Sequence, residues 1–277
     1  MDRKWLDIPY ANISESEKLD IFLPNEYKQQ YPAIMLIHGG GFRFGDKQGI
    51  ELKLTLKPAL EQGFAVVSIN YRLSPEAKFP AAPQDVNAAI RFIRANAYSY
   101  NIDPYRIALW GTSSGGNLAS LAGTTGEYTN FVNYNLNNCR VPWFVSCVVD
   151  FYGPINFLTM DSQFVINGLD GQNHNAADSF ESLYMGAPIQ TIPLTVQKSN
   201  PEVYITPNTC PFLIEHGTLD KNIPYQQSVI FAQKLNKKIS DSKINLRLID
   251  GAGHGGSLFE TKDNLDLVFN FLKTYVC

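Results

Sequence analysis

The sequence lacks the features that mark nucleic-acid-binding and membrane proteins. Its 277 residues carry a formal net charge of −3, without a block of Lys or Arg that could bind a phosphate backbone. No apolar run approaches the roughly 18–20 residues that a membrane span needs. Residues 1–7 lack the apolar core of a signal peptide. We therefore expect neither a nucleic-acid partner nor a membrane span, and a cytoplasmic location, with secretion as the alternative if a signal peptide has been removed.

Cysteine is also scarce, and its spacing indicates neither a metal site nor a disulfide framework. The 4 cysteines are Cys139, Cys147, Cys210 and Cys277. None belongs to a Cys-x-x-Cys pair or lies beside a histidine at metal-ligand spacing, so we expect no metal site. Cys147 lies in an apolar stretch, where we expect a buried small hydrophobic residue. A disulfide between Cys139 and Cys147 stays open at this stage.

The composition is that of a globular protein with a sizeable core. Hydrophobic residues make up 44% of the sequence and charged residues 18%. The length suits one large α/β domain, and no internal repeat or low-complexity segment divides it. We therefore expect a single domain over residues 1–277.

Segments with strand character alternate with segments of helical periodicity. Continuous apolar runs at 33–37 and 64–69 are typical of strands buried on both faces. Further strands are expected at 19–24, 106–110, 144–150, 211–215 and 244–249, and helices at 50–62, 83–97, 117–122, 231–239 and 265–272. This alternation predicts an α/β fold with an open, mostly parallel sheet and helices on both faces.

Two stretches depart from this alternation. Residues 128–143 are polar and rich in Asn, which predicts a surface loop. Residues 151–208 are longer than a crossover connection needs and mix short helix-like pieces with Gly and Pro. We interpret this second stretch as a small inserted cap over the carboxyl edge of the sheet.

A Gly-x-Ser-x-Gly pattern at residues 111–115 lies between an expected strand and an expected helix. A serine on such a sharp turn is held in a strained backbone conformation that lifts its hydroxyl above the sheet. The N-terminus of the following helix favours negative charge at the same place. Ser113 is therefore the candidate nucleophile, although the bare pattern also occurs in ordinary turns.

A serine nucleophile needs a base, and His254 is the best candidate of the 4 histidines. It lies in a glycine-rich loop after the last expected strand. His38 precedes a run of three glycines and is expected to brace that loop through hydrogen bonds. His216 lies at a strand end, where orienting a loop is its expected role, and His174 is expected to be solvated in the polar cap region.

Three aspartates could orient the base, since Asp150, Asp220 and Asp250 all lie between the serine and the histidine. Asp250 is too close to His254 in the same loop. Asp150 ends the strand after the elbow strand, which is an alternative location for the acid, but we expect it to hydrogen-bond nearby backbone. Asp220 follows the next strand and can reach the final loop. We favour Asp220.

Attack on a carbonyl also requires donors for the oxyanion that forms. The backbone N–H of Ser114, directly after the nucleophile, can serve together with those of Gly40 and Gly41. In an open α/β sheet the glycine loop, Ser113, Asp220 and the final loop all lie at the carboxyl edge, where ligands bind. This chemistry needs no metal or organic cofactor.

With these residues placed, the chain resembles the α/β-hydrolase superfamily, in its esterase branch with a His-Gly-Gly-Gly loop. The resemblance rests on the segments 19–24, 38–42, 46–47, 71–73, 79–82 and 216–220. They are similar to the hormone-sensitive-lipase-like and the bifunctional acetylxylan/feruloyl esterase groups. The second group is the closer match, because the N-terminal part is short and lacks the helical cap of the first. Ser114 stands where those groups usually have alanine, which leaves its backbone N–H available.

The resemblance implies an α/β-hydrolase fold and a serine carboxylesterase that hydrolyses short-acyl or aryl esters, including acetyl or feruloyl groups on plant polysaccharide. Its partner would be a small ester or an acylated oligosaccharide. From loop position we expect Phe42, Tyr152 and Ile223 in the substrate pocket. Two alternatives stay open: an amide-hydrolysing relative, such as an arylformamidase or a peptidase, and a non-catalytic ligand receptor on the same fold. The oligomeric state is not determined.

Overall fold

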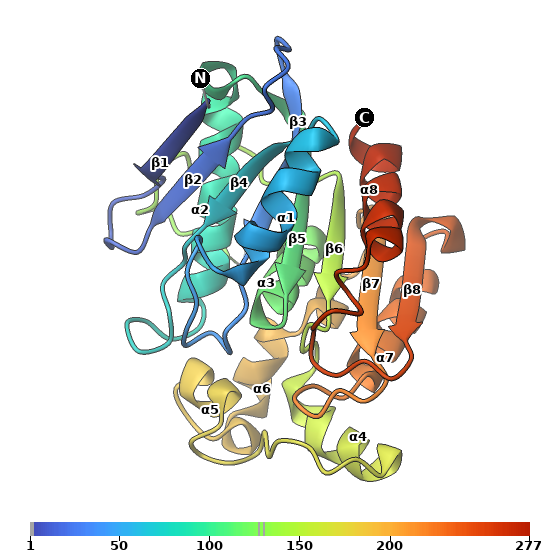
Figure 1. Cartoon of the computed structure of the whole chain (residues 1–277). Coiled ribbons are helices and arrows are strands. Elements are labelled where there is room, and N and C mark those ends of the chain that lie inside the picture. The colour runs from blue at the N-terminus through green and yellow to red at the C-terminus, as the bar shows by residue number, and fades with distance from the viewer. Residues whose placement is uncertain (1–2, 127, 130) are drawn as a thin grey trace.

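The protein is built around one mixed β-sheet (Figure 1). The computed structural model describes residues 3–126, 128–129 and 131–277. Within these, an 8-stranded sheet has the order β1-β2-β4-β3-β5-β6-β7-β8. The strands are β1 (Lys4–Pro9), β2 (Lys18–Phe22), β3 (Tyr31–Ile37), β4 (Ala65–Ile69), β5 (Ile102–Thr112), β6 (Cys147–Phe151), β7 (Phe212–Gly217) and β8 (Ile244–Ile249). The β1–β2 and β2–β4 pairs are antiparallel, and the remaining pairs are parallel.

Helices cover both faces of this sheet. They are α1 (Ile50–Glu61), α2 (Ala81–Asn96), α3 (Ser114–Thr124), α4 (Met160–Asn167), α5 (Phe180–Met185), α6 (Pro193–Val196), α7 (Gln226–Asn236) and α8 (Lys262–Val276). Short 3₁₀ turns lie at 97–100, 157–159, 189–191, 197–199, 201–204 and 241–243. Figure 1 shows α1 and α8 on one face and α2, α3 and α7 on the other.

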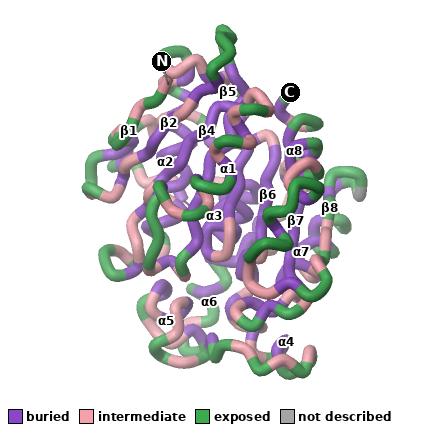
Figure 2. The backbone as a smooth tube through the Cα atoms, viewed as in Figure 1, coloured by how far each residue is buried: buried purple, intermediate pink, exposed green. Residues whose placement is uncertain are grey.

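The central strands are buried on both faces because each faces a layer of helices. In β3, Ala33, Met35 and Ile37 belong to the core layer that includes α2, α3 and α7. Ile34 and Leu36 belong to the layer that includes α1 and α8. Successive side chains of a strand point to opposite faces, so a strand between two helical layers must be apolar throughout. Figure 2 shows this buried centre surrounded by exposed loops.

The segment between β6 and β7, residues 152–211, carries α4, α5 and α6 and is named the cap segment below. Figure 1 shows these helices beyond the carboxyl ends of the parallel strands, at the bottom of the view. The longest of them, α4, has 8 residues. The cap segment therefore faces the edge of the sheet where the candidate site residues gather. Its contacts are described with that site.

Some sequence expectations need correction. Residues 128–143 are not simply a polar surface loop, since Phe131, Leu136 and Trp143 are buried. Asn130, inside this stretch, lies outside the described residues. The burial of these three apolar side chains was not predicted, because they are spaced irregularly within a stretch of polar composition. None of the helices in the described part of the chain combines the length and hydropathy that a membrane span requires.

The possible Cys139–Cys147 disulfide is wrong, because both cysteines are free. Cys147 lies in β6 and packs into the core layer of α1 and α8. Cys139 is partly exposed and lies in the irregular stretch before β6.

Candidate active site

Ser113 occupies the turn between β5 and α3 with φ 52° and ψ −124°. This left-handed conformation is strained for a residue with a side chain and persists only where the surroundings enforce it. Neighbouring backbone does so here: a Cβ on Gly111 would lie 2.0 Å from the Gly115 carbonyl oxygen, and a Cβ on Gly115 would lie 2.1 Å from that of Ile37. Both glycines of the pattern are thus required by the close approach of backbone segments.

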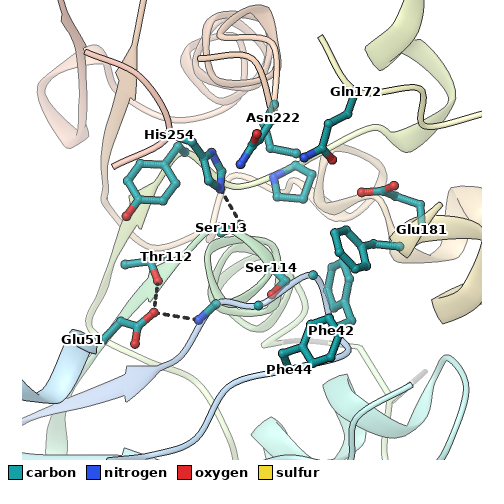
Figure 3. A pocket seen from close by; sticks show the side chains of 17 residues that line it. Phe42, Phe44, Glu51, Thr112, Ser113, Ser114, Gln172, Glu181, Asn222 and His254 are labelled. Carbon is teal, nitrogen blue, oxygen red and sulfur yellow. Dashed lines mark hydrogen bonds between the residues drawn. The ribbon is translucent and has the colours of Figure 1, made fainter. Parts of the chain in front are cut away.

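His254 connects this serine to Asp220. Its Nε2 lies 2.9 Å from Ser113 Oγ, and its Nδ1 lies 2.7 Å from Asp220 Oδ2. Burial by itself would raise the pKa of Asp220, but hydrogen bonds from His216 and His254 outweigh it and hold that pKa well below its ordinary value. An ionised carboxylate only accepts hydrogen bonds, so His254 carries its proton on Nδ1. The lone pair of Nε2 therefore faces the serine hydroxyl (Figure 3).

Asp220 is fully buried and held by its own loop. The N–H groups of Asn222 and Ile223 donate to Asp220 Oδ1 at 2.8 and 2.9 Å. His216 Nε2 lies 3.3 Å from Oδ2 and 3.0 Å from the Ile223 carbonyl oxygen. His216 thus contacts the loop, as expected from the sequence. These contacts fix the carboxylate toward His254.

The two other aspartates lie elsewhere. Asp150 is fully buried and accepts hydrogen bonds from the Ser120 hydroxyl at 2.8 Å and from the Gly153 N–H at 3.0 Å. Asp250 is exposed and accepts a hydrogen bond from the Thr218 hydroxyl at 3.2 Å. No hydrogen bond joins either carboxylate to His254 within the described residues.

The glycine loop after β3 supplies free backbone donors. Gly40 and Gly41 have φ 116° and 61°, and no described residue accepts a hydrogen bond from either N–H. A Cβ on Gly40 would lie 2.3 Å from the Phe44 carbonyl oxygen, so a side chain there is excluded. His38 braces the loop, as expected, because its Nδ1 lies 2.8 Å from the Gly39 carbonyl oxygen. The hydroxyl of Tyr71 donates to the His38 carbonyl oxygen at 2.9 Å.

The candidate nucleophile, its base and the free backbone donors line one cavity of about 310 Å³. Its lining includes Ser113, Ser114, Gly40, Gly41 and His254, together with the three residues expected in a substrate pocket, which are Phe42, Tyr152 and Ile223. The Phe42 ring is buried and stacks on Tyr184 with a centroid distance of 4.0 Å. The Tyr152 ring packs against His254 at 4.6 Å.

The cavity also has walls that sequence reasoning missed. Phe44, Glu51, Gln172, Phe180, Glu181 and Asn222 line it. Figure 3 shows Gln172 and Asn222 on one side of Ser113 and the phenylalanines 42 and 44 on the other. Gln172 and Glu181 belong to the cap segment, and no local sequence pattern predicts how this segment packs against the sheet. Phe44 lies three residues after the glycine run, so it is the one of these six residues that a recognised sequence motif could have indicated.

His174 is not solvated, contrary to expectation. It is buried in the cap segment, with Nδ1 2.9 Å from Glu181 Oε2 and Nε2 2.8 Å from the Asn222 carbonyl oxygen. Burial would lower the pKa of His174, but the hydrogen bond and charge of Glu181 raise it above its usual value. The polar neighbours of His174 in the sequence suggested solvent exposure because its partners are 7 and 48 residues away along the chain.

Comparison with known proteins places this arrangement in a family. A family model described as BD-FAE matches residues 19–235, which is most of the chain. The chain belongs to the BD-FAE family. This confirms the resemblance drawn from the glycine loop and the serine elbow. The α/β-hydrolase fold expected from that resemblance is also confirmed.

Individual relatives of this BD-FAE protein are esterases. It is similar to a structure described as a truncated form of a carbohydrate esterase from gut microbiota, with 32% identity, a TM-score of 0.87 and coverage of 99% of this chain and 96% of that chain. The acetyl ester-xyloside bifunctional hydrolase from Caldicellulosiruptor lactoaceticus has 25% identity and a TM-score of 0.72, covering 93% and 88% of the two chains. Esterase LipC of Mycobacterium tuberculosis is 28% identical over 229 residues, which is 83% of this chain and 54% of that protein. The chain thus spans about half the length of the curated relatives it matches.

Proposed function

We propose that this BD-FAE protein is a serine carboxylesterase in which Ser113, His254 and Asp220 form a catalytic triad. One observation carries the proposal: a serine hydroxyl on a strained turn lies 2.9 Å from the unprotonated nitrogen of His254, inside a cavity that also holds unpaired backbone N–H groups. A hydroxyl, a base and oxyanion donors at one point are the requirements of acyl transfer.

In the acylation step, Ser113 Oγ attacks the ester carbonyl carbon while His254 Nε2 takes the hydroxyl proton. The carbonyl oxygen becomes an oxyanion, which the N–H groups of Gly40, Gly41 and Ser114 stabilise. His254 then gives its proton to the leaving alcohol oxygen as the C–O bond breaks. The ionised Asp220 stabilises the imidazolium that exists between these two transfers.

Deacylation repeats the sequence with water in place of Ser113. His254 Nε2 removes a proton from a water molecule, whose oxygen attacks the acyl carbon. The same N–H groups hold the second oxyanion. Collapse releases the carboxylic acid, and His254 returns the proton to Ser113 Oγ.

The substrate class follows from the cavity walls and the relatives. Phe42, Phe44 and Phe180 offer an apolar wall, whereas Gln172, Glu181 and Asn222 offer hydrogen-bonding groups. A small acyl group could pack against the apolar side of the cavity, while an alcohol part that carries hydroxyl groups could hydrogen-bond to the polar side. Similar structures are described as a carbohydrate esterase and an acetyl ester-xyloside hydrolase. We propose acylated oligosaccharides as the substrates.

Hydrolysis of p-nitrophenyl acetate and butyrate by the intact protein and by Ser113→Ala tests the proposal. We expect Ser113→Ala to lose about 10⁴-fold or more in kcat, because no other group can form the acyl-enzyme. Circular dichroism should show the same fold for both proteins. Equal rates for the two proteins would remove Ser113 from the nucleophile role and favour the ligand-receptor alternative. Acetylated xylo-oligosaccharides then test the substrate class.

A further inference from the structure

Glu51 has contacts that neither the proposed mechanism nor the family match assigns a role. It is the second residue of α1 and is only partly buried. Its Oε1 accepts a hydrogen bond from the Gly39 N–H at 3.1 Å and another from the Thr112 hydroxyl at 2.9 Å (Figure 3). One carboxylate oxygen thus holds two loops that are more than 70 residues apart in the sequence.

Each of these two loops carries one half of the proposed catalytic machinery. Gly39 directly precedes the N–H donors of Gly40 and Gly41, and Thr112 directly precedes Ser113. The β3–β5 ladder that joins the two loops from below ends with the pair Ile37↔Gly111. Beyond that pair, the Glu51 carboxylate joins the residue before the oxyanion donors to the residue before the nucleophile.

Two other groups hold the glycine loop: the His38 ring, and the Tyr71 hydroxyl, which also interacts with the Ser114 side chain of the elbow. Glu51 differs from both because its two donors come from the residues directly before the oxyanion donors and the nucleophile. The carboxylate is itself anchored, because Leu52 and Ala59 of the same helix pack into the core. Its position in the first turn of α1 also places its charge at the favourable end of the helix dipole.

We propose that Glu51 is a positioning residue that sets the spacing between the oxyanion donors and the nucleophile. The inference rests on the proposed function. Oxyanion donors act only when they lie about 2.7–3.1 Å from the developing charge, and catalytic groups tolerate errors of about 0.5 Å. Hydrogen bonds to a carboxylate are stronger than those to a neutral acceptor, which makes this a stiff link. Without it, the glycine loop can drift from Ser113 while the pocket that binds substrate keeps its walls.

The test compares Glu51→Ala and Glu51→Gln with the unaltered protein on p-nitrophenyl acetate. We expect Glu51→Ala to lower kcat by about 10- to 100-fold, which is at or below the loss of about 10²- to 10³-fold seen when an oxyanion donor is removed outright, with KM changed less than about threefold. Inhibition by a trifluoromethyl ketone, which forms an oxyanion on Ser113, should weaken by the same factor. Glu51→Gln should recover most of both losses, because its amide oxygen can accept both hydrogen bonds.

Two further variants separate positioning from a general loss of structure. Thr112→Val removes one donor to Glu51 with little change in shape, and we expect an intermediate loss of kcat that Thr112→Ser restores. Glu61→Ala is the matched control, since Glu61 is an exposed glutamate in the last turn of α1. Its kcat and inhibition should equal those of the unaltered protein, and thermal unfolding should show that each variant is folded at the assay temperature.

The outcomes distinguish the inference from the proposed function. Ser113-dependent hydrolysis with Glu51→Ala within twofold of the unaltered protein would overturn the inference alone. So would a loss of kcat without a parallel loss of ketone inhibition, or a Glu51→Gln variant as impaired as Glu51→Ala. Hydrolysis that does not depend on Ser113 would overturn the proposed function, and the positioning role would fall with it.

Discussion

At the scale of single residues, the candidate site is defined by a chain of hydrogen bonds with a fixed direction. Asp220 faces Nδ1 of His254, and Nε2 of His254 faces Ser113. The direction of this chain is fixed at its acidic end, because the carboxylate is ionised and can only accept hydrogen bonds. The proton on Nδ1 leaves Nε2 as the acceptor for the serine. One change at position 220 therefore alters the whole chain.

We predict that Asp220→Asn lowers kcat by about 10⁴-fold, because an amide NH₂ can donate to Nδ1 and stabilise the wrong tautomer of His254. The measurement is kcat for p-nitrophenyl acetate at neutral pH. Asp250→Asn is the control, since that carboxylate is exposed and bonded to Thr218. An equal loss in both variants would contradict the assignment of Asp220.

A second prediction at this scale concerns the effect of the elbow glycines on stability. A Cβ on Gly115 would lie 2.1 Å from the Ile37 carbonyl oxygen, and that oxygen belongs to the backbone of a central strand, which cannot move aside. We expect Gly115→Ala to lower the free energy of unfolding by about 4 kcal/mol or more, or to prevent folding. Gly126→Ala should change it by about 0.5 kcal/mol or less, because its nearest neighbour, Phe144 Cα, would be 3.6 Å away. Urea unfolding of the two variants measures the difference, and similar stabilities would contradict the close approach.

At the scale of elements, the cap segment is joined to the loop that carries Asp220. His174 of the cap segment donates from Nε2 to the Asn222 carbonyl oxygen, and the Asn222 N–H donates to Asp220. Because a carbonyl oxygen only accepts, His174 holds a proton on Nε2, and the Glu181 carboxylate facing Nδ1 favours a second one. The backbone N–H of His174 also donates to Asp161 Oδ1 at 2.8 Å. The cap segment is thus tied to the acid loop through a histidine whose charged form is favoured.

This contact predicts a pH-dependent contribution to stability. The folded pKa of His174 lies above its usual value, because Glu181 outweighs the effect of burial. Its contribution is therefore fully present below about pH 6.5, the ordinary value for histidine, and is lost as pH rises through the folded pKa. We expect the stability difference between the unaltered protein and His174→Gln to shrink from pH 6 to pH 9 in urea unfolding. A difference that stays constant over this range would contradict the charged pair.

At the scale of the whole molecule, the sheet edge and the cap segment enclose a cavity of about 310 Å³. The cap helices α4, α5 and α6 have 8, 6 and 4 residues, so none forms a long amphipathic lid. Phe180 closes the space beside Gly41, where a Cβ would lie 2.7 Å from its ring. The space for an acyl group is therefore bounded on several sides.

We predict a preference for short acyl groups. The value of kcat/KM should be at least about tenfold higher for p-nitrophenyl acetate or butyrate than for the laurate ester, because a long chain must leave the cavity and meet water. Initial rates below the aggregation limit of the laurate ester make the comparison. Faster turnover of laurate would contradict it. Phe180→Ala should reduce the difference in kcat/KM between the short-acyl esters and the laurate ester, because it removes the ring that lies beside Gly41.

The sequence by itself determined the order of the elements and the identity of the family. Continuous apolar runs predicted the central strands because strands between two helical layers have no polar face. Close backbone approach requires glycine, so the glycine loop and the elbow were visible as sequence motifs. The extra residues of β5, Ile102–Thr112 instead of 106–110, and the later start of β6 at Cys147 were missed because strand ends depend on partners.

Only the tertiary structure decided which polar groups meet. Glu51 reaches Thr112 across 61 residues, and His174 reaches the Asn222 carbonyl oxygen across 48. Neither residue stands in a local pattern, because a carboxylate in a first helical turn and a histidine in a polar stretch are both common on surfaces. A local sequence pattern reflects only the requirements that a residue places on its neighbours along the chain. A hydrogen bond between distant segments depends on how the sheet and the cap segment pack, and that packing is not encoded in any short stretch of the chain.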